Sequence, residues 1–365
     1  MEGLVRPAWN GRRVLVTGDT GFKGSWLALW LNAMGAKVTG FALSPPTEPS
    51  LFEAARIGEL IHHVDGDVRD PRAVSDAFAA ADPEVVFHLA AQPLVRLSYA
   101  EPAETYATNV MGTVHVLEAA RHSPSVKAIV CITSDKCYEN REWAWPYREC
   151  DPMGGHDPYS SSKGCAELAV SAWRRSFFHA EGPLLASGRA GNVIGGGDWA
   201  SDRLVPDLVR AFEAGVAPLI RSPGSVRPWQ HVLEALRGYI MLAERLLAGE
   251  REFAEGWNFG PSDEDARPVS WIVSRMRAAW GGEAKDAGLD SQPGVHEAGL
   301  LRLDSSKART ALGWQPVLGL QEALDWIAEW HKCVNARFDP REVTLGQIEV
   351  YQARCRSRSG LAAAA

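Results

Sequence analysis

The chain has 365 residues, 46% of them hydrophobic, and a formal net charge of −7 at pH 7. This length predicts two domains or two interleaved lobes around a full hydrophobic core. The acidic balance and the lack of a basic stripe exclude a general nucleic-acid-binding protein. No apolar run reaches the roughly 20 residues of a membrane span, and the N-terminus has no secretory-type apolar stretch. The six cysteines show no paired metal-ligand spacing, so we expect reduced thiols, no metal site and a cytoplasmic protein.

Short β-branched runs alternate with helical stretches through the first half of the chain. We expect strands at 12–17, 37–41, 61–65, 85–89 and 127–133, and helices at 25–34, from Asp70 onward and around 104–121. Alternation of this kind predicts a parallel sheet with helices on both faces. The fold class is therefore predicted to be α/β, with a Rossmann-like doubly wound parallel sheet.

The pattern changes after residue 185, where consecutive glycines and several prolines interrupt the rhythm. We expect residues 10–185 to form a dinucleotide-binding Rossmann domain, to which segments near 225–260 return. Residues 186–340 are expected to form a smaller mixed α/β lobe that binds the substrate. Residues 350–365 are expected to be a C-terminal tail, of which residues 357–365 fray unless a neighbour orders their alanines.

A glycine-rich turn follows the first strand and leads into an apolar helix. Gly18 permits the tight turn, Gly21 lets the backbone approach a pyrophosphate, and Gly24 allows close packing of the helix on the strand. The acidic residue usually found about 20 positions further on is not obvious here. No Arg or Lys lies between residues 38 and 55 to meet a 2′-phosphate, so we expect NAD rather than NADP.

Tyr159 and Lys163 lie one helical turn apart, after the fifth expected strand. A nearby ammonium is expected to lower the pKa of the phenol from about 10, so that tyrosinate can accept a proton from a sugar hydroxyl. Lys163 can also hold the nicotinamide ribose. Ser134, at the end of a strand, is placed to hydrogen-bond the reacting oxygen. These residues predict hydride transfer between a hydroxyl group and a nicotinamide.

Asp135 suggests more than hydride transfer, because a carboxyl group beside the oxidation centre can protonate a departing hydroxyl. The neighbouring Lys136 can act as the base that removes a carbon-bound proton only if its pKa falls from about 10.4. Alternatively, Lys136 steadies Asp135 or a sugar oxygen. Both interpretations remain open from the sequence.

Six motifs, together with these residues, resemble the extended short-chain dehydrogenase/reductases over residues 10 to 335. Within that superfamily the chain is similar to the nucleotide-sugar 4,6-dehydratases, and to the branch that acts on CDP-glucose in particular. Many relatives that act on dTDP-glucose carry Glu at the position of Lys136. The motifs are 17–27, 88–92, 108–113, 133–143, 151–167 and 189–199.

The resemblance implies a hydro-lyase with catalytic NAD that forms CDP-4-dehydro-6-deoxyglucose and water, for deoxysugars such as those of lipopolysaccharide O-antigen. A dehydratase of another nucleotide sugar, a nucleotide-sugar 4-epimerase and a non-catalytic NAD-binding regulator are the alternatives. An epimerase has no need of an acid at Asp135, and a regulator has no need of the whole catalytic set. Relatives pair through two long helices, here near 104–121 and 159–179, so a homodimer or homotetramer is implied.

The resemblance also extends the predicted site. Arg227 is the best candidate to hold a diphosphate, since a guanidinium meets phosphate oxygens in a fork. Leu300 stands where a tyrosine is expected after His296, which affects that expected contact. Further cofactor contacts are expected at Thr20, Phe22, Lys23, Asp67, Val68, Leu89, Ala90, Ala91 and Thr108. Substrate contacts are expected at Gln92, Asn192, Arg203, Arg227, His231 and His296.

Overall fold

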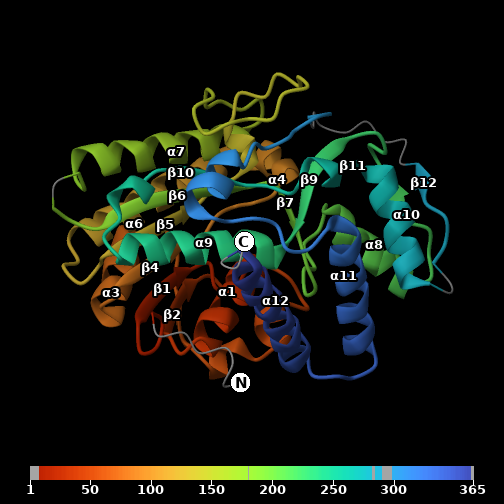
Figure 1. Ribbon diagram of the computed structural model, residues 1–365, viewed down its shortest axis with the longest axis horizontal. Coiled ribbons are helices and arrows are strands. Elements are labelled where there is room, and N and C mark those ends of the chain that lie inside the picture. The colour runs from red at the N-terminus through yellow and green to blue at the C-terminus, as the bar shows by residue number, and fades with distance from the viewer. Residues whose placement is uncertain (1–7, 180, 282–283, 290–297, 363–365) are drawn as a thin grey trace.

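A seven-stranded parallel sheet forms the centre of the larger lobe (Figure 1). The computed structural model describes residues 8–179, 181–281, 284–289 and 298–362. The strand order β10-β6-β5-β4-β1-β2-β3 reverses direction beside β1, as in a doubly wound sheet, and confirms the expected fold class. The strands are β1 (Arg13–Thr17), β2 (Lys37–Ala42), β3 (His62–Asp65), β4 (Val85–His88), β5 (Ala128–Ile132), β6 (Leu184–Ala190) and β10 (Gly256–Phe259).

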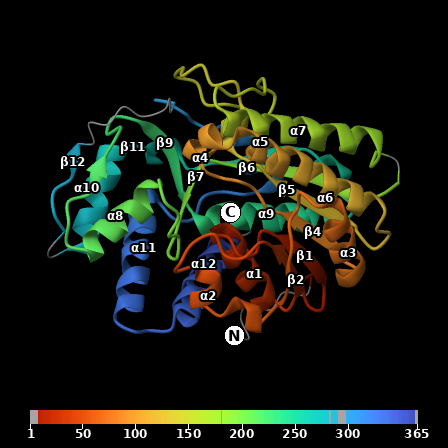
Figure 2. The same cartoon turned by 180° about the vertical axis from the view of Figure 1, so that it is seen from behind.

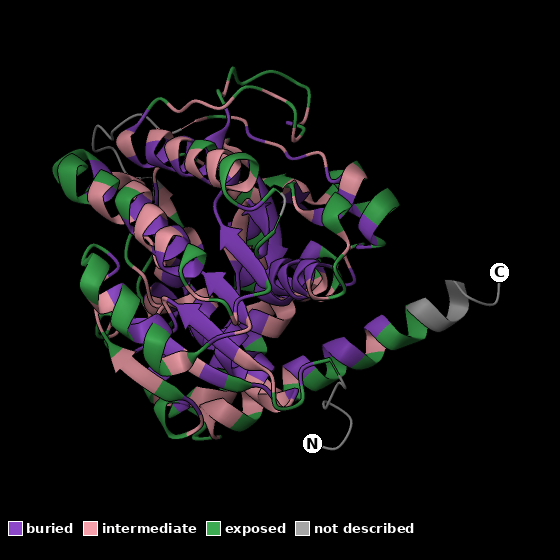
Figure 3. Cartoon of the chain, turned by 90° about the vertical axis from the view of Figure 1, so that its left-hand side faces the viewer, coloured by how far each residue is buried: buried purple, intermediate pink, exposed green. Residues whose placement is uncertain are grey.

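Helices cover both faces of this sheet, so its central strands are buried on both sides. Val14 and Val16 of β1 face one core, whereas Leu15 between them faces the other. Figure 3 shows the central strands as a buried layer, whereas the edge strand β3 is exposed or only partly buried. The first core packs against α1 (Phe22–Ala33), α9 (Val232–Leu247) and α12 (Pro340–Ala362). The second packs against α3 (Pro71–Ala81), α6 (Gly112–Arg121) and α7 (Pro158–Ser176), which face the viewer in Figure 2.

The smaller lobe is built on a three-stranded mixed sheet of order β11-β9-β7. In it, β7 (Asn192–Ile194) runs parallel to β9 (Val226–His231), and β11 (Ala266–Pro268) runs antiparallel to β9. A separate core fills the space between this sheet and its helices. The other elements of the lobe are α8 (Leu204–Glu213), β8 (Leu219–Ile220), α10 (Val269–Trp280), β12 (Gly288–Leu289) and α11 (Leu320–Asn335).

The chain returns twice from the smaller lobe to the larger one. First, α9 packs on the sheet and β10 pairs with β6, which is the return expected near residues 225–260. Second, α12 packs beside α1, where Tyr351 meets Trp30 and donates a hydrogen bond to Glu234 Oε2 at 2.7 Å. The buried Tyr351 and Cys355 pack α12 against its neighbours, and the helix continues to Ala362, into the segment from Ser357 onward for which fraying was predicted.

The helical stretch expected around 104–121 is interrupted by one wide turn. The π-helical segment η2 (Ala107–Met111) separates α5 (Pro102–Tyr106) from α6, and such segments often mark functional sites. No helix in the described ranges has the length and apolarity needed to span a membrane. The remaining short elements are α2 (Leu51–Ala54), η1 (Ile57–Glu59), α4 (Val95–Ala100), η3 (Asp135–Cys137), η4 (Arg251–Phe253), η5 (Asp263–Asp265) and η6 (Ala308–Leu312).

Candidate active site

The expected catalytic residues meet at the carboxyl end of the sheet. Strand β5 ends just before Ser134, which caps the short helix η3 by accepting a hydrogen bond from Lys136 N at 3.2 Å. Helix α7 begins nearby, where Asp157 accepts from Ser160 N at 2.9 Å, and its first turns bury Tyr159. The local caps therefore fix where each catalytic segment starts.

Asp135 is a buried carboxyl group with one oxygen unused. Ser134 Oγ donates to Asp135 Oδ1 at 3.0 Å, whereas Oδ2 has no partner among the residues that the structure describes. Burial raises the pKa of Asp135 above its usual value, although the charge of Lys136 acts in the opposite direction. Burial of this kind makes the protonated form, which can give a proton away, more accessible than in an exposed carboxyl group.

Tyr159 and Lys163 are both buried on the same face of α7. Burial raises the pKa of Tyr159 to about 12, and the hydrogen bond from Ser134 works against that increase. Burial also lowers the pKa of Lys163 to about 8. Burial therefore has a larger effect on the pKa of Tyr159 than the neighbouring groups that lower it, and the lowering expected from Lys163 remains a prediction.

Cationic side chains lie within electrostatic reach of Asp135. Lys23, in the first turn of α1, is half-buried, and burial followed by the charges of Lys163 and Arg203 lowers its pKa to about 7. Arg203 donates to Asp198 Oδ2 at 3.0 Å and also lowers the pKa of Tyr159. Lys23 thus lies within electrostatic reach of the catalytic groups as well as in the glycine-rich turn.

The glycine-rich turn fits a dinucleotide. Gly18 has φ +77°, and a Cβ there would lie 2.7 Å from the backbone nitrogen of Ala90 at the end of β4. A Cβ on Gly24 would overlap the carbonyl oxygen of Gly18, so α1 approaches the turn as closely as backbone allows. No side chain caps the N-terminus of α1 at Gly21, which leaves this end available to a pyrophosphate.

The other expected cofactor residues line the same edge of the sheet. Thr20 Oγ1 donates to Leu43 O at 2.8 Å, which ties the turn to the end of β2. Asp67 is ion-paired with Arg69, and Val68 lies in the core beneath α6. Phe22 and Lys23 begin α1, Leu89, Ala90 and Ala91 follow β4, and Thr108 lies in η2. Their contacts with a cofactor remain predictions.

Asn109 is a site residue that the sequence analysis missed. Its side chain accepts from Gln92 N at 2.8 Å and donates to Gln92 O at 3.1 Å and to Ser162 Oγ at 2.9 Å. It therefore joins η2, the loop after β4 and the catalytic helix. The only signal in the sequence was its place in the 108–113 motif, because nothing local announces a π-helical turn.

The smaller lobe contributes three of the expected substrate residues. Arg227 is buried on β9, donates to Val226 O at 3.0 Å and to Gly299 O at 3.2 Å, and lowers the pKa of Asp135. Asn192 lies half-buried on β7, the strand paired with β9. Arg203 lies at the start of α8 and lowers the pKa of Tyr159, as Arg227 lowers that of Asp135.

The comparisons with known proteins agree with this geometry. A family model described as GDP-mannose 4,6 dehydratase matches residues 15–326. The chain belongs to this GDP-mannose 4,6-dehydratase family. The CDP-glucose 4,6-dehydratase of Salmonella typhimurium strain LT2 is 58% identical over 329 residues, which cover 89% of this chain and 91% of that protein. The identity therefore extends over both lobes.

Two solved structures show the same fold as this family member. A Thermotoga maritima UDP-glucose 4-epimerase with UDP-glucose gives a TM-score of 0.77 at 23% identity, covering 88% of this chain and 99% of that one. A Bacillus anthracis dTDP-glucose 4,6-dehydratase in complex with NAD gives 0.75 at 21% identity, covering 91% and 100%. Since dehydratase and epimerase share the fold, the chemistry has to be argued from side chains.

Two expected substrate residues of this dehydratase-family protein, Gln92 and His231, make contacts within the protein. The Gln92 side chain is occupied by Leu94 and Thr105, so it holds the loop together. His231 is 1% exposed, caps α9 by accepting from Leu233 N, and packs edge-on against Trp26 and Trp326. His231 thus packs in the interior and caps α9, and its expected substrate contact remains a prediction. His296 lies outside the described residues.

Proposed function

We propose that this protein converts CDP-glucose to CDP-4-dehydro-6-deoxyglucose and water, with NAD as a catalytic cofactor. The observation that carries the proposal is Asp135, a buried carboxyl group with a raised pKa and an unused oxygen beside Ser134. Oxidation and reduction at one carbon require no such acid, whereas elimination of water does. The 58% identity to a CDP-glucose 4,6-dehydratase supports the choice of substrate.

The residues present fit NAD. The pyrophosphate would meet the uncapped N-terminus of α1, with Lys23 in its first turn, while Lys163 would hold the nicotinamide ribose. The absence of Arg and Lys between residues 38 and 55 disfavours a 2′-phosphate. When bound, NAD supplies a hydride acceptor for C4 of the sugar and a hydride donor for C6.

The remaining steps of the reaction are proton transfers, and each is assigned to a side chain of the site. Tyr159 takes the proton of the sugar 4-hydroxyl, with Ser134 hydrogen-bonding the same oxygen and Lys163 stabilising the phenolate. The resulting 4-ketone acidifies the proton at C5. Asp135 then protonates the departing 6-hydroxyl as C5 loses its proton, which gives a 4-keto-5,6-ene and water. The net reaction is an elimination in which the cofactor ends in its starting state.

The group that removes the C5 proton is Lys136 or a neighbour. Lys136 lies half-buried next to Asp135, and its charge favours the ionised carboxyl, so a supporting role also fits. Exchange of the C5 proton with solvent deuterium in Lys136→Ala separates the two roles. Lost exchange with intact C4 oxidation assigns the base to Lys136, and unchanged exchange leaves it a supporting role.

The diphosphate of the substrate is proposed to bind Arg227 with help from Arg203 and Asn192. The guanidinium of Arg227 lies near Asp135, so a diphosphate held there places the attached sugar beside the catalytic groups. Arg203 extends the positive charge toward Tyr159. Arg227→Lys keeps the charge but loses the fork, and is expected to raise KM more than it lowers kcat.

A nucleotide-sugar 4-epimerase is the second candidate, since it shares Tyr159 and Lys163 and the fold of a solved epimerase. Incubation with CDP-glucose separates the two. A dehydratase yields a 4-keto product that absorbs in alkali, without net formation of NADH. A 4-epimer would overturn the proposal, and turnover of dTDP-glucose or UDP-glucose in preference to CDP-glucose would overturn the substrate. A bare NAD-binding regulator would give no product.

We further propose a homodimer or homotetramer in the cytoplasm, serving deoxysugar biosynthesis such as that of O-antigen. Helices α6 and α7 pack side by side, and this region carries exposed apolar side chains at Tyr106, Met111, Leu168 and Phe177. Exposed apolar side chains on neighbouring helices suit a two-fold interface between copies. The six cysteines are free thiols in the structure, in keeping with a reducing compartment.

A further inference from the structure

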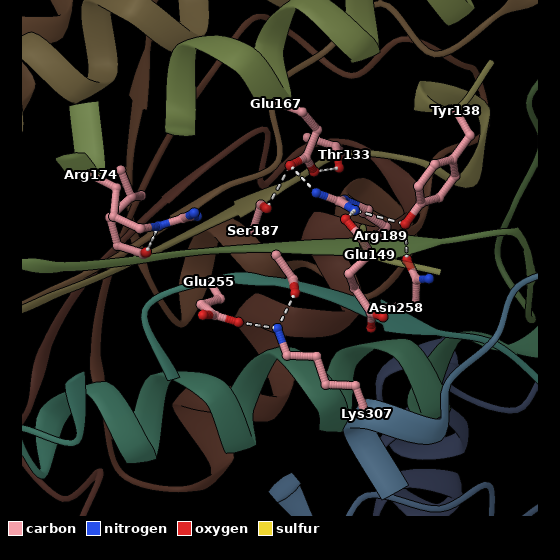
Figure 4. A network of polar contacts seen from close by, with 12 residues as sticks. Thr133, Tyr138, Glu149, Glu167, Arg174, Ser187, Arg189, Glu255, Asn258 and Lys307 are labelled. Carbon is pink, nitrogen blue, oxygen red and sulfur yellow. Dashed lines mark hydrogen bonds and ion pairs between the residues drawn. The ribbon is translucent and has the colours of Figure 1, made fainter. Parts of the chain in front are cut away.

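A buried carboxylate, that of Glu167, belongs to a network of polar contacts with Thr133, Ser187 and Arg189 (Figure 4). Glu167 lies on α7 one turn beyond Lys163 and is 4% exposed. It accepts hydrogen bonds from Thr133 Oγ1, from Ser187 Oγ at 2.8 Å and from Arg189 Nη2 at 2.8 Å. One side chain therefore ties the catalytic helix to the ends of β5 and β6.

Arg189 carries the connection to the segment after Asp135. Its Nη1 donates to Tyr138 Oη at 2.7 Å, and Tyr138 donates to Asn258 Oδ1 at 2.7 Å. The guanidinium also lies over the Tyr138 ring, 5.2 Å from its centroid. Asn258 in turn donates to Tyr147 O at 2.9 Å. The network therefore holds the chain at Thr133, just before the turn that carries Asp135, and at Tyr138, just after it.

Stability alone does not explain the buried ion pair between Glu167 and Arg189. A buried ion pair gains little net stability, because desolvation of both charges offsets their attraction, and apolar residues of similar size often replace one without loss. One partner of Glu167, Thr133, directly precedes Ser134, and Glu167 itself lies on α7, the helix that carries Tyr159. Its other two partners, Ser187 and Arg189, lie on β6. Specification of position is the role that these contacts favour.

We propose that Glu167 is a positioning residue for the catalytic reaction, which fixes α7 against the end of β5 and keeps Lys163 charged. The first effect holds Tyr159 in register with Ser134 and Asp135. The second follows from location, since the negative charge of Glu167 is one helical turn from Lys163. The inference rests on the proposed function only in that both use the oxidation at C4.

The electrostatic surroundings of Lys163 set the direction of the test. Glu167 raises the pKa of Lys163, which burial has lowered to about 8. Removing the carboxylate charge therefore lowers that pKa further, and Lys163 loses its proton at a lower pH. The titratable and charged groups within electrostatic reach of Lys163 are His88 at the end of β4, Cys131 on β5, Cys137 in η3, Lys23 on α1 and Glu167 on α7.

The first variant is Glu167→Gln in the full-length holoenzyme, and Glu234→Gln is its matched control. Glu234 is equally buried, accepts from Val317 N and Leu318 N at 2.7 Å and from Tyr351, and lies away from the catalytic helix. Glu167→Gln is expected to lower kcat by roughly tenfold to 100-fold with little change in KM, as misplacement by about 1 Å does. Glu234→Gln is expected to lower Tm with kcat unchanged.

The pH profile separates positioning from mere stability. The alkaline limb of kcat is expected to move down by roughly one pH unit in Glu167→Gln, the effect of one nearby charge, and to stay in place in Glu234→Gln. The double variant Glu167→Met/Arg189→Met removes the ion pair without leaving a charge unpaired. The proposal is supported if the double variant recovers the Tm of the wild type but neither its kcat nor the position of its alkaline limb.

Wild-type kcat and an unmoved alkaline limb in the folded double variant would overturn it. The readout is hydride transfer at C4, followed in a single turnover with CDP-glucose. A wild type that forms a 4-epimer defeats the proposed function but leaves this comparison valid, because epimerisation uses the same oxidation. A wild-type dehydratase whose Glu167 variants behave like Glu234→Gln defeats the inference alone.

Discussion

Asp135 and Gly191 face each other across the two lobes' junction: a Cβ on Gly191 would lie 3.0 Å from the unused Oδ2 of Asp135. Gly191 connects β6 of the large sheet to β7 of the smaller lobe. The absent side chain leaves the catalytic oxygen uncrowded on that side. Gly191, at which the chain passes from the larger lobe to the smaller one, thus also leaves room beside Oδ2 of Asp135.

Replacing Asp135 by Asn tests its role as an acid. Asn keeps the shape but has no proton to give to the departing hydroxyl, so dehydration of CDP-glucose is expected to fall by roughly 100-fold to 10,000-fold. Oxidation at C4 is expected to persist, measured as NADH absorbance in a single turnover. In Tyr159→Phe, the matched control, that absorbance should vanish. Equal loss of both readouts in Asp135→Asn would contradict a separate acid role.

Gly24→Ala tests the fit of the cofactor turn. The added Cβ overlaps the carbonyl oxygen of Gly18, so the turn or α1 has to shift. We expect NAD affinity to fall at least tenfold by titration calorimetry and stability to drop by about 1–3 kcal/mol, the usual cost of overpacking.

Gly346→Ala is the control for that change, since no atom lies within 4 Å of a Cβ there. Gly346 is inside α12, where Ala is the better helix former by about 0.5–1 kcal/mol. This variant should bind NAD as the wild type does and melt at a higher temperature. NAD affinity unchanged in Gly24→Ala would rule out the proposed pyrophosphate site.

Leu168→Glu tests the proposed subunit interface. Leu168 is 60% exposed on α7, and a two-fold axis would bring two new carboxylates into one apolar contact. We expect sedimentation to show a shift from dimer or tetramer toward a smaller species. Leu219→Glu, at a 66% exposed position in the other lobe, should sediment as the wild type does. An unaltered Leu168→Glu assembly would place the interface elsewhere.

Acid stability depends on histidines that the fold keeps neutral. Burial lowers the pKa of His231 from 6.5 to about 3 and that of His88 to about 3. Between pH 6.5 and 3 the unfolded chain takes up protons that the folded protein refuses, so stability falls as the pH falls. Each such group contributes about 1.4 kcal/mol per pH unit within that window.

His231→Asn removes one of the two buried histidines, and with it one proton that the unfolded chain binds, but leaves a side chain that can cap α9. The free energy of unfolding, from urea titrations, should fall less steeply between pH 6 and 5, by about 1.4 kcal/mol per pH unit. Above pH 7 the difference between variant and wild type should be independent of pH. If the free energies of unfolding of variant and wild type run parallel between pH 6 and 5, His231 is protonated in the folded protein as it is in the unfolded chain.

Local patterns in the sequence were enough to predict the larger lobe and the positions of its chemistry. Strand periodicity, the Gly18 turn, and the spacing of Tyr159 and Lys163 are properties of neighbouring residues, and each depends on backbone geometry over a few positions. Parallel strands place their carboxyl ends at one edge, so the meeting of Ser134 and Tyr159 followed from the fold class.

Only the tertiary structure decided what those residues experience. Desolvation comes from distant parts of the chain, so the raised pKa values of Asp135 and Tyr159 could not be read from spacing. The bond from Arg189 to Glu167 crosses from β6 to α7, and Asn109 reaches its partners through a π-helical turn. Sequence thus determined which groups are present and on which elements they lie. Packing between elements determined their charge, their partners and which of them face the substrate.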